Sequence, residues 1–233
     1  MERIFVFLRS PGAATTVLLG ATIIALIVAN SPLATQYMSL VNLPLGPLTA
    51  MEWVNDALMA IFFLFVGLEV KRELVSGELN TNAKRIMPGI AALFGVIVPA
   101  IIFYLIAGSN DVYVHGWAIP TATDIAFAIG VITALGSRVP NSMKVFLTAL
   151  AVIDDLIAII VIAIFYAASI NLFYLVASVI VTGLLIYCNR SGYVRSLSYI
   201  ILGIILWYCI LRSGLHATMA GVILAMTIPE RGK

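Results

Sequence analysis

The stretch AVIDDL, residues 151–156, places Asp154 and Asp155 side by side within an apolar run that extends from residue 145 to residue 167. A run of this length is close to the ~20 residues that a helix needs to cross the hydrocarbon core of a bilayer. Each aspartate near the centre of a membrane costs about 2.5–3.5 kcal/mol if it faces lipid. The stretch therefore predicts a helix whose acidic side chains face a packed interior or a water-filled funnel.

The composition of the whole chain agrees with a membrane location. Hydrophobic residues make up 62% of the 233 residues and charged residues only 10%, against about 25% charged residues in soluble domains. The mean hydropathy is +1.11. A soluble core could not bury this much apolar surface, so the composition excludes a water-soluble enzyme, a disordered chain and a nucleic-acid-binding protein. It predicts an all-α protein with several membrane spans.

Eight apolar runs predict eight transmembrane helices in one membrane domain, residues 1–233. Turn and polar signals separate most of the runs, and a short surface hairpin is expected at residues 43–48. The first run is long for the apolar core of a signal peptide, so we expect it to remain as an anchor. The predicted spans lie near residues 12–29, 51–69, 87–107, 117–136, 145–167, 172–188, 196–211 and 214–229.

The basic residues predict the orientation, because cytoplasmic loops of membrane proteins carry an excess of Lys and Arg. If the N-terminus is cytoplasmic, only Arg212 lies outside. Both termini are then cytoplasmic. The two cysteines, Cys188 and Cys209, fall at opposite ends of neighbouring helices and are expected to remain unpaired. The twelve basic residues on the inner side are Arg3, Arg9, Lys71, Arg72, Lys84, Arg85, Arg138, Lys144, Arg190, Arg195, Arg231 and Lys233.

The two adjacent carboxylates favour exchange of a cation for protons. They cannot both ionise cheaply in a medium of low dielectric constant, so a proton competes with a hard cation such as Na⁺ for the site. The alternative, buried acids that only stabilise helix packing, fits the pair poorly because these spans hold no basic partner. For Asp56, in the second run, the two interpretations are about equal. With only two histidines and two cysteines, the chain predicts no transition-metal centre and no cofactor.

The fourth run adds an acid beside a helix-breaking residue. It contains Pro120, which lacks a backbone donor, followed by Thr123 and Asp124. Thr and Asp side chains can satisfy backbone groups that a break leaves without partners. Secondary transporters build ion sites from such discontinuous helices near the membrane centre. The alternative is an ordinary proline kink.

Five strings in the chain resemble the NhaA family of bacterial sodium/proton antiporters. They are spread over most of the sequence, so the resemblance covers nearly the whole chain. The strings are WVNDALMA at 53–60, VGLEVKREL at 66–74, AIPTATDIAF at 118–127, IDD at 153–155 and SGLHATMAG at 213–221.

The resemblance implies roles for individual residues. Asp155 is expected to be the principal carboxylate for the cation and the proton, with Asp154 as its partner. Asp124 and Thr123 are expected at an unwound helix break that completes the site. A charged cytoplasmic mouth involved in pH activation would contain Glu69, Arg72 and Glu73, and Asp56 and His216 would have supporting roles, the histidine in pH dependence.

Plainer interpretations of the outer residues remain open. On the sequence alone, residues 71–73 are typical of a cytoplasmic loop with local ion pairs. His216 alone is typical of a hydrogen-bonded helix histidine.

The resemblance also implies a difference. The family fold has twelve helices with an inverted repeat, whereas this chain has eight apolar runs. The second repeat, its broken helix and the lysine that pairs with the residue at position 154 are expected to be missing. A homodimer or a complementing chain therefore remains open as a partner.

Two functional hypotheses follow. The first is a secondary active transporter, not an enzyme, in the bacterial inner membrane. It would exchange cytoplasmic Na⁺ or Li⁺ for external H⁺ and so serve pH and sodium homeostasis. The second is a truncated membrane protein that does not transport, or half of a transporter that needs a partner chain. A passive channel is a third and weaker reading, because paired acids suit exchange better.

Overall fold

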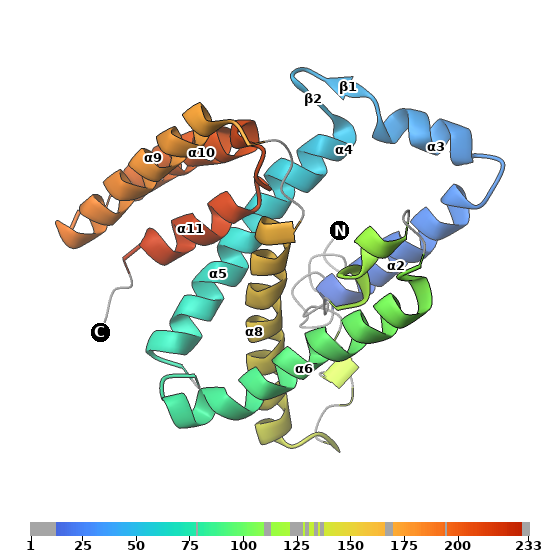
Figure 1. The fold of residues 1–233 in the computed structure, drawn as a ribbon, viewed down its shortest axis with the longest axis horizontal. Coiled ribbons are helices and arrows are strands. Elements are labelled where there is room, and N and C mark those ends of the chain that lie inside the picture. Colours follow the sequence, from blue (N-terminus) through green and yellow to red (C-terminus); the bar gives the residue numbers. More distant parts are fainter. Residues whose placement is uncertain are drawn as a thin grey trace, which may run out of the picture. The chain divides into compact units, whose positions relative to one another are not determined.

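The computed structural model describes residues 13–77, 79–109, 113–121, 128, 131–132, 135, 138–165, 170–193 and 195–229, and the fold is mainly helical (Figure 1). The N-terminal elements are α2 (Ala13–Ala29), α3 (Ala34–Val41), β1 (Pro44–Leu45), β2 (Leu48–Thr49), α4 (Ala50–Glu52), the π-helix η1 (Trp53–Leu58) and α5 (Met59–Val75). They are followed by α6 (Asn82–Ala107), the 3₁₀ turns η2 (Val114–Gly116) and η3 (Ile119–Thr121), α8 (Asn141–Phe165), α9 (Leu172–Arg190), α10 (Ser196–Ser213) and α11 (Met219–Thr227).

Four helical stretches among the described residues are long and apolar enough to cross a membrane. They are Ala50–Val75, Asn82–Ala107, Leu172–Arg190 and Ser196–Ser213. A fifth is possible if Thr16–Ala29 and Ala34–Val41, which are bent by 119°, form one broken span. The described residues therefore form a mainly helical protein with several candidate membrane spans, while eight spans and an inverted repeat stay predictions. The predicted span 117–136 lies largely outside the described residues.

The chain divides into two compact units. One contains Met1–Met51 and Pro88–Asp154, and the other contains Glu52–Met87 and Asp155–Lys233. Each unit has packing of its own.

In the first unit, the predicted hairpin is present. Strands β1 and β2 pair in antiparallel fashion, with Leu45 opposite Leu48. Gly46 has a φ of +76°, which is the left-handed conformation that a type II′ hairpin turn requires at its first central position. The bend between α2 and α3 is stabilised by Ser31, whose hydroxyl donates to the carbonyl of Val28 (2.8 Å) and accepts from the amide of Leu33 (3.1 Å).

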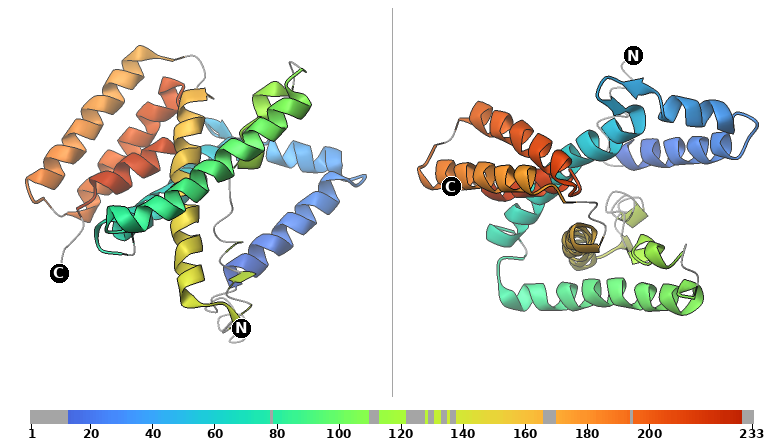
Figure 2. Two further views of the ribbon diagram at one scale, coloured as in Figure 1. Left: turned by 60° about the horizontal axis from the view of Figure 1, so that its bottom comes forward. Right: turned by 45° about the horizontal axis from the view of Figure 1, so that its top comes forward.

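The second unit is built from α5, α9, α10 and α11. Its core contains Leu185 and Leu206, both 0% exposed, and Ile210, 1% exposed. Helices α9 and α10 run side by side in all views, with α11 next to α10 (Figures 1 and 2). Gly214, with a φ of +87°, ends α10 in the left-handed conformation that glycine adopts most easily.

Three details of this unit differ from the sequence-based expectation. Residues 71–73, which the sequence alone indicates as part of a cytoplasmic loop, are helical, because α5 continues to Val75. Helix α11 occupies only nine residues of the range 214–229. The start of the second predicted span is a π-helix, η1, which contains Asp56. Cys188 and Cys209 are free, as expected.

Candidate functional site

Asp154 and Asp155 lie in the second half of α8, within a continuous helix. Asp154 is 2% exposed, and neither of its carboxylate oxygens is accessible to solvent. Asp155 is half-buried. Successive helical residues point about 100° apart, so the two carboxylates leave the helix in different directions. The boundary between the two compact units falls between these two residues.

The second part of the predicted site is only partly visible. Thr123 and Asp124 lie outside the described residues. Immediately before them, Ile119–Thr121 form a 3₁₀ turn instead of an α-helix. Thr121 is 5% exposed, and its hydroxyl donates to the carbonyl of Ala118 at 2.7 Å. The described residues that lead to Asp124 are therefore not regular α-helix, which is compatible with a break at Pro120.

The predicted charged mouth lies in the last two turns of α5. Glu69 and Arg72 are exposed, and Glu73 is half-buried. The turn that follows is held by Arg85, which donates to the carbonyl of Leu74 at 2.9 Å and also to that of Leu79. The three predicted residues therefore share one helical segment with a fixed end.

Asp56 and His216, which are far apart in the sequence, both lie in the second unit. Asp56 is half-buried in η1, and His216 is exposed in the turn before α11. The backbone carbonyl of Asp56 accepts a hydrogen bond from the indole of Trp207 at 2.7 Å. Since π-helical segments are frequent at functional sites, the position of Asp56 in η1 is compatible with a functional role as well as with a packing role.

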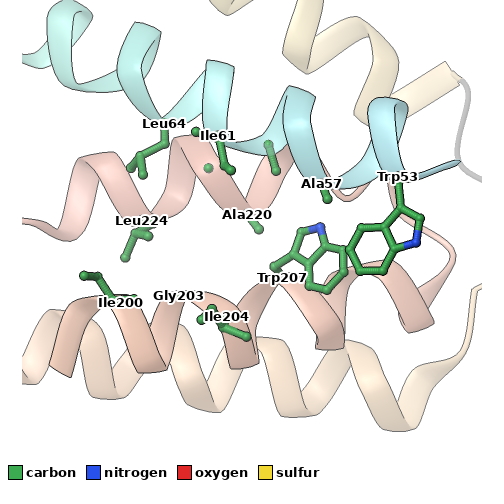
Figure 3. Close-up of a pocket in the computed structure, with 12 residues that line it drawn as sticks. Trp53, Ala57, Ile61, Leu64, Ile200, Gly203, Ile204, Trp207, Ala220 and Leu224 are labelled. Carbon is green, nitrogen blue, oxygen red and sulfur yellow. The ribbon is translucent and has the colours of Figure 1, made fainter. Parts of the chain in front are cut away.

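A cavity of about 440 Å³ lies between η1, α5, α10 and α11 (Figure 3). Trp53 and Trp207 stack at one end of it, with ring centroids 6.2 Å apart. Its wall contains no charged side chain. The wall is almost entirely apolar, and one of its residues, Trp207, donates to the backbone carbonyl of Asp56. The other lining residues are Ala57, Ala60, Ile61, Leu64, Ile200, Gly203, Ile204, Ala220, Gly221 and Leu224.

No group of three or more His, Cys, Asp or Glu side chains suited to a metal ion occurs within the part of the chain that the structure describes. The acids that the sequence singled out thus fall into separate places: the pair in α8, the mouth on α5, and Asp56 in η1. Sequence reasoning missed Trp207. No local pattern predicts its hydrogen bond to the carbonyl of Asp56, because the two residues are far apart in the sequence.

Comparison with known proteins gives a consistent result. Residues 6–233 match the model of the family described as Na+/H+ antiporter 1. The chain is 56% identical over 223 residues to an Na(+)/H(+) antiporter NhaA of Mesorhizobium japonicum. It is 52% identical to an NhaA antiporter of Brucella ovis and 49% identical to one of Rhizobium etli.

These alignments cover 96% of this chain but only 56–57% of each relative, so the chain spans a little over half the length of the curated relatives that it matches. The family match extends over almost the entire sequence, including all five strings that suggested the resemblance. The chain belongs to the Na+/H+ antiporter 1 family.

Proposed function

We propose that this chain carries the carboxylate pair of a sodium/proton antiporter and exchanges Na⁺ or Li⁺ for protons at Asp154 and Asp155. The observation that carries the proposal is the position of this pair in α8, with Asp154 2% exposed in a membrane protein of an antiporter family. A carboxylate so shielded is costly when charged and unbalanced. A cation or a proton removes that cost, so the two compete for one site.

The exchange follows from this competition. When Na⁺ enters from the cytoplasm, carboxylate oxygens, which are suitable ligands for a hard cation, bind it and release protons. On the other side, external protons displace the cation. If the pair releases two protons for each Na⁺, one net charge crosses the membrane, and the membrane potential contributes about 2.3 kcal/mol per charge per 100 mV.

The remaining predicted residues support this cycle. We propose that Thr123 and Asp124 complete the ion site at the break in the fourth span. Glu69, Arg72 and Glu73 form the cytoplasmic entrance that makes transport depend on pH, and Asp56 and His216 support the opposite end of α5. The protein would lie in the bacterial inner membrane with both termini in the cytoplasm and would serve pH and sodium homeostasis. A second copy of the chain or a complementing chain is the proposed partner.

The test is Na⁺-induced proton movement in everted membrane vesicles from a host that lacks antiporters of its own. We expect a response to Na⁺ and Li⁺ from the wild-type chain and a loss of at least 100-fold in Asp155→Asn, because the amide neither binds a proton nor carries the charge that attracts the cation. Glu2→Gln, which removes a carboxylate outside the predicted spans, should respond like the wild type. Normal activity in Asp155→Asn would disprove the assignment.

A further inference from the structure

The carbonyl groups at the end of helix α11 accept hydrogen bonds from other parts of the chain. Its nine residues, at about 1.5 Å per residue, span about 14 Å, far less than the ~30 Å hydrocarbon core. The last carbonyl groups of a helix have no partner within the helix. Where such groups lie at membrane depth, other parts of the protein must supply donors.

Every carbonyl from Leu224 to Ile228 accepts a hydrogen bond. That of Leu224 accepts from the amide of Ile228 (3.0 Å) and from the hydroxyl of Thr227 (2.8 Å). That of Thr227 accepts from the side-chain amide of Asn189 in α9 (2.5 Å). The other three depend on one residue of α5, Lys71.

The ammonium group of Lys71 lies 2.5 Å from the carbonyl oxygen of Ile228, 2.8 Å from that of Met226 and 3.5 Å from that of Ala225. A lysine ammonium has three donors and no acceptor, and it also opposes the negative end of the helix dipole. Lys71 therefore caps α11 from a neighbouring helix. Its direction differs from that of Glu69 and Arg72 on the same helix, which are exposed.

We propose that Lys71 is a positioning residue of the antiporter: by fixing the end of α11 to α5, it sets the rotation of the last two turns of α5 and with it the direction of Glu69, Arg72 and Glu73. This inference rests on the proposed function, since it concerns the entrance that those three residues form. Lys71 itself need not contact the transported ion. Its charge is directed at backbone carbonyls on α11.

The first experiment measures the cap without relying on transport. Thr227, 6% exposed at the end of α11, is replaced by cysteine in a chain that also carries Cys188→Ser and Cys209→Ala. The rate of labelling with a water-soluble maleimide is then measured on the purified chain in mild detergent. We expect slow labelling with Lys71, at least tenfold faster labelling with Lys71→Met, and a rate within about threefold of the starting chain with Lys71→Arg, which keeps a cationic donor.

Lys84→Met is the matched control, because Lys84 is an exposed lysine at the start of α6 and its loss removes the same charge. It should leave the labelling rate unchanged. Equal labelling in Lys71→Met and in the starting chain would overturn the proposal, as would equally fast labelling in Lys84→Met.

The second experiment records the pH profile of Na⁺-dependent proton movement in vesicles for the same variants without the added cysteine. Lys71→Met should displace the profile by about one pH unit or flatten it, whereas Lys71→Arg and Lys84→Met should follow the wild type. If Lys71→Met increases the labelling rate at position 227 but leaves the pH profile unchanged, the positioning role is wrong. If the wild-type chain itself gives no response, the proposed function fails, and the labelling rates alone then decide whether Lys71 fixes α11.

Discussion

Helix α11 packs against α5, α9 and α10 in its unit, and its interfaces with α5 and α10 are built differently. Against α5 the contact is backbone to backbone: a Cβ atom on Gly221 would collide with the carbonyl oxygen of Ala60 and the amide nitrogen of Leu64. Against α10 the contact is made by a side chain, because a Cβ atom on Gly203 would meet only the end of Leu224, 2.5 Å from its Cδ2 atom.

The difference indicates which pair of helices behaves as a rigid body. Close approach of backbones through small residues is a common way for membrane helices to associate, and a backbone cannot move aside without moving its helix. A leucine side chain can change rotamer, so the contact between Gly203 and Leu224 can adjust. Helices α5 and α11 therefore form the fixed pair, joined by Gly221 along their length and by Lys71 at one end. Helix α10 has room to adjust.

The largest expected effect tests the fixed pair. Gly221→Ala should reduce the free energy of unfolding in mild detergent by about 3 kcal/mol or more, because the added methyl group forces two backbones apart, at the upper end of the cost of overpacking. The measurement is the midpoint of thermal unfolding of the purified chain. A midpoint within 1 °C of the wild type would show that the two helices are not fixed by this contact.

A smaller effect on the free energy of unfolding is expected at the interface between α10 and α11. Gly203→Ala adds the same methyl group but displaces only the tip of Leu224, so the free energy of unfolding should change by about 1 kcal/mol or less. The same unfolding assay, run in parallel, compares the two glycines directly. Equal losses in the two variants would remove the distinction between the interfaces.

The sequence predicts the helices of this protein well where a long apolar run decides the structure. Runs 172–188 and 196–211 became α9 and α10, with ends within two residues of those expected. It predicts less where packing decides. Helix α5 continues through the charged residues 71–73, where Lys71 contacts the end of α11, and such contacts leave no local pattern.

The candidate site shows the same limit. Two adjacent acids in an apolar run predicted a helix with shielded carboxylates, and Asp154 is indeed buried. The hydrogen bond from Trp207 to the carbonyl of Asp56 was not predicted, since residues so distant in sequence meet only through the fold. Nor could periodicity reveal that Lys71 points away from its charged neighbours, because a lysine in a cytoplasmic segment is already explained by the positive-inside rule.

The smallest effect is expected at the end of the cavity, where Trp207 joins α10 to η1. Trp207→Phe keeps an aromatic ring beside Trp53 but removes the hydrogen bond to the carbonyl of Asp56, which should cost about 1 kcal/mol of the free energy of unfolding. Tyr208→Phe, a change at an exposed neighbour on the same helix, is the control and should cost less. If Trp207→Phe reduces the free energy of unfolding as much as Gly221→Ala does, α10 is held as firmly as α11. The distinction between a fixed and an adjustable interface would then be wrong. A cost near 1 kcal/mol would instead show that one hydrogen bond, next to the π-helix, limits how far α10 can move from η1.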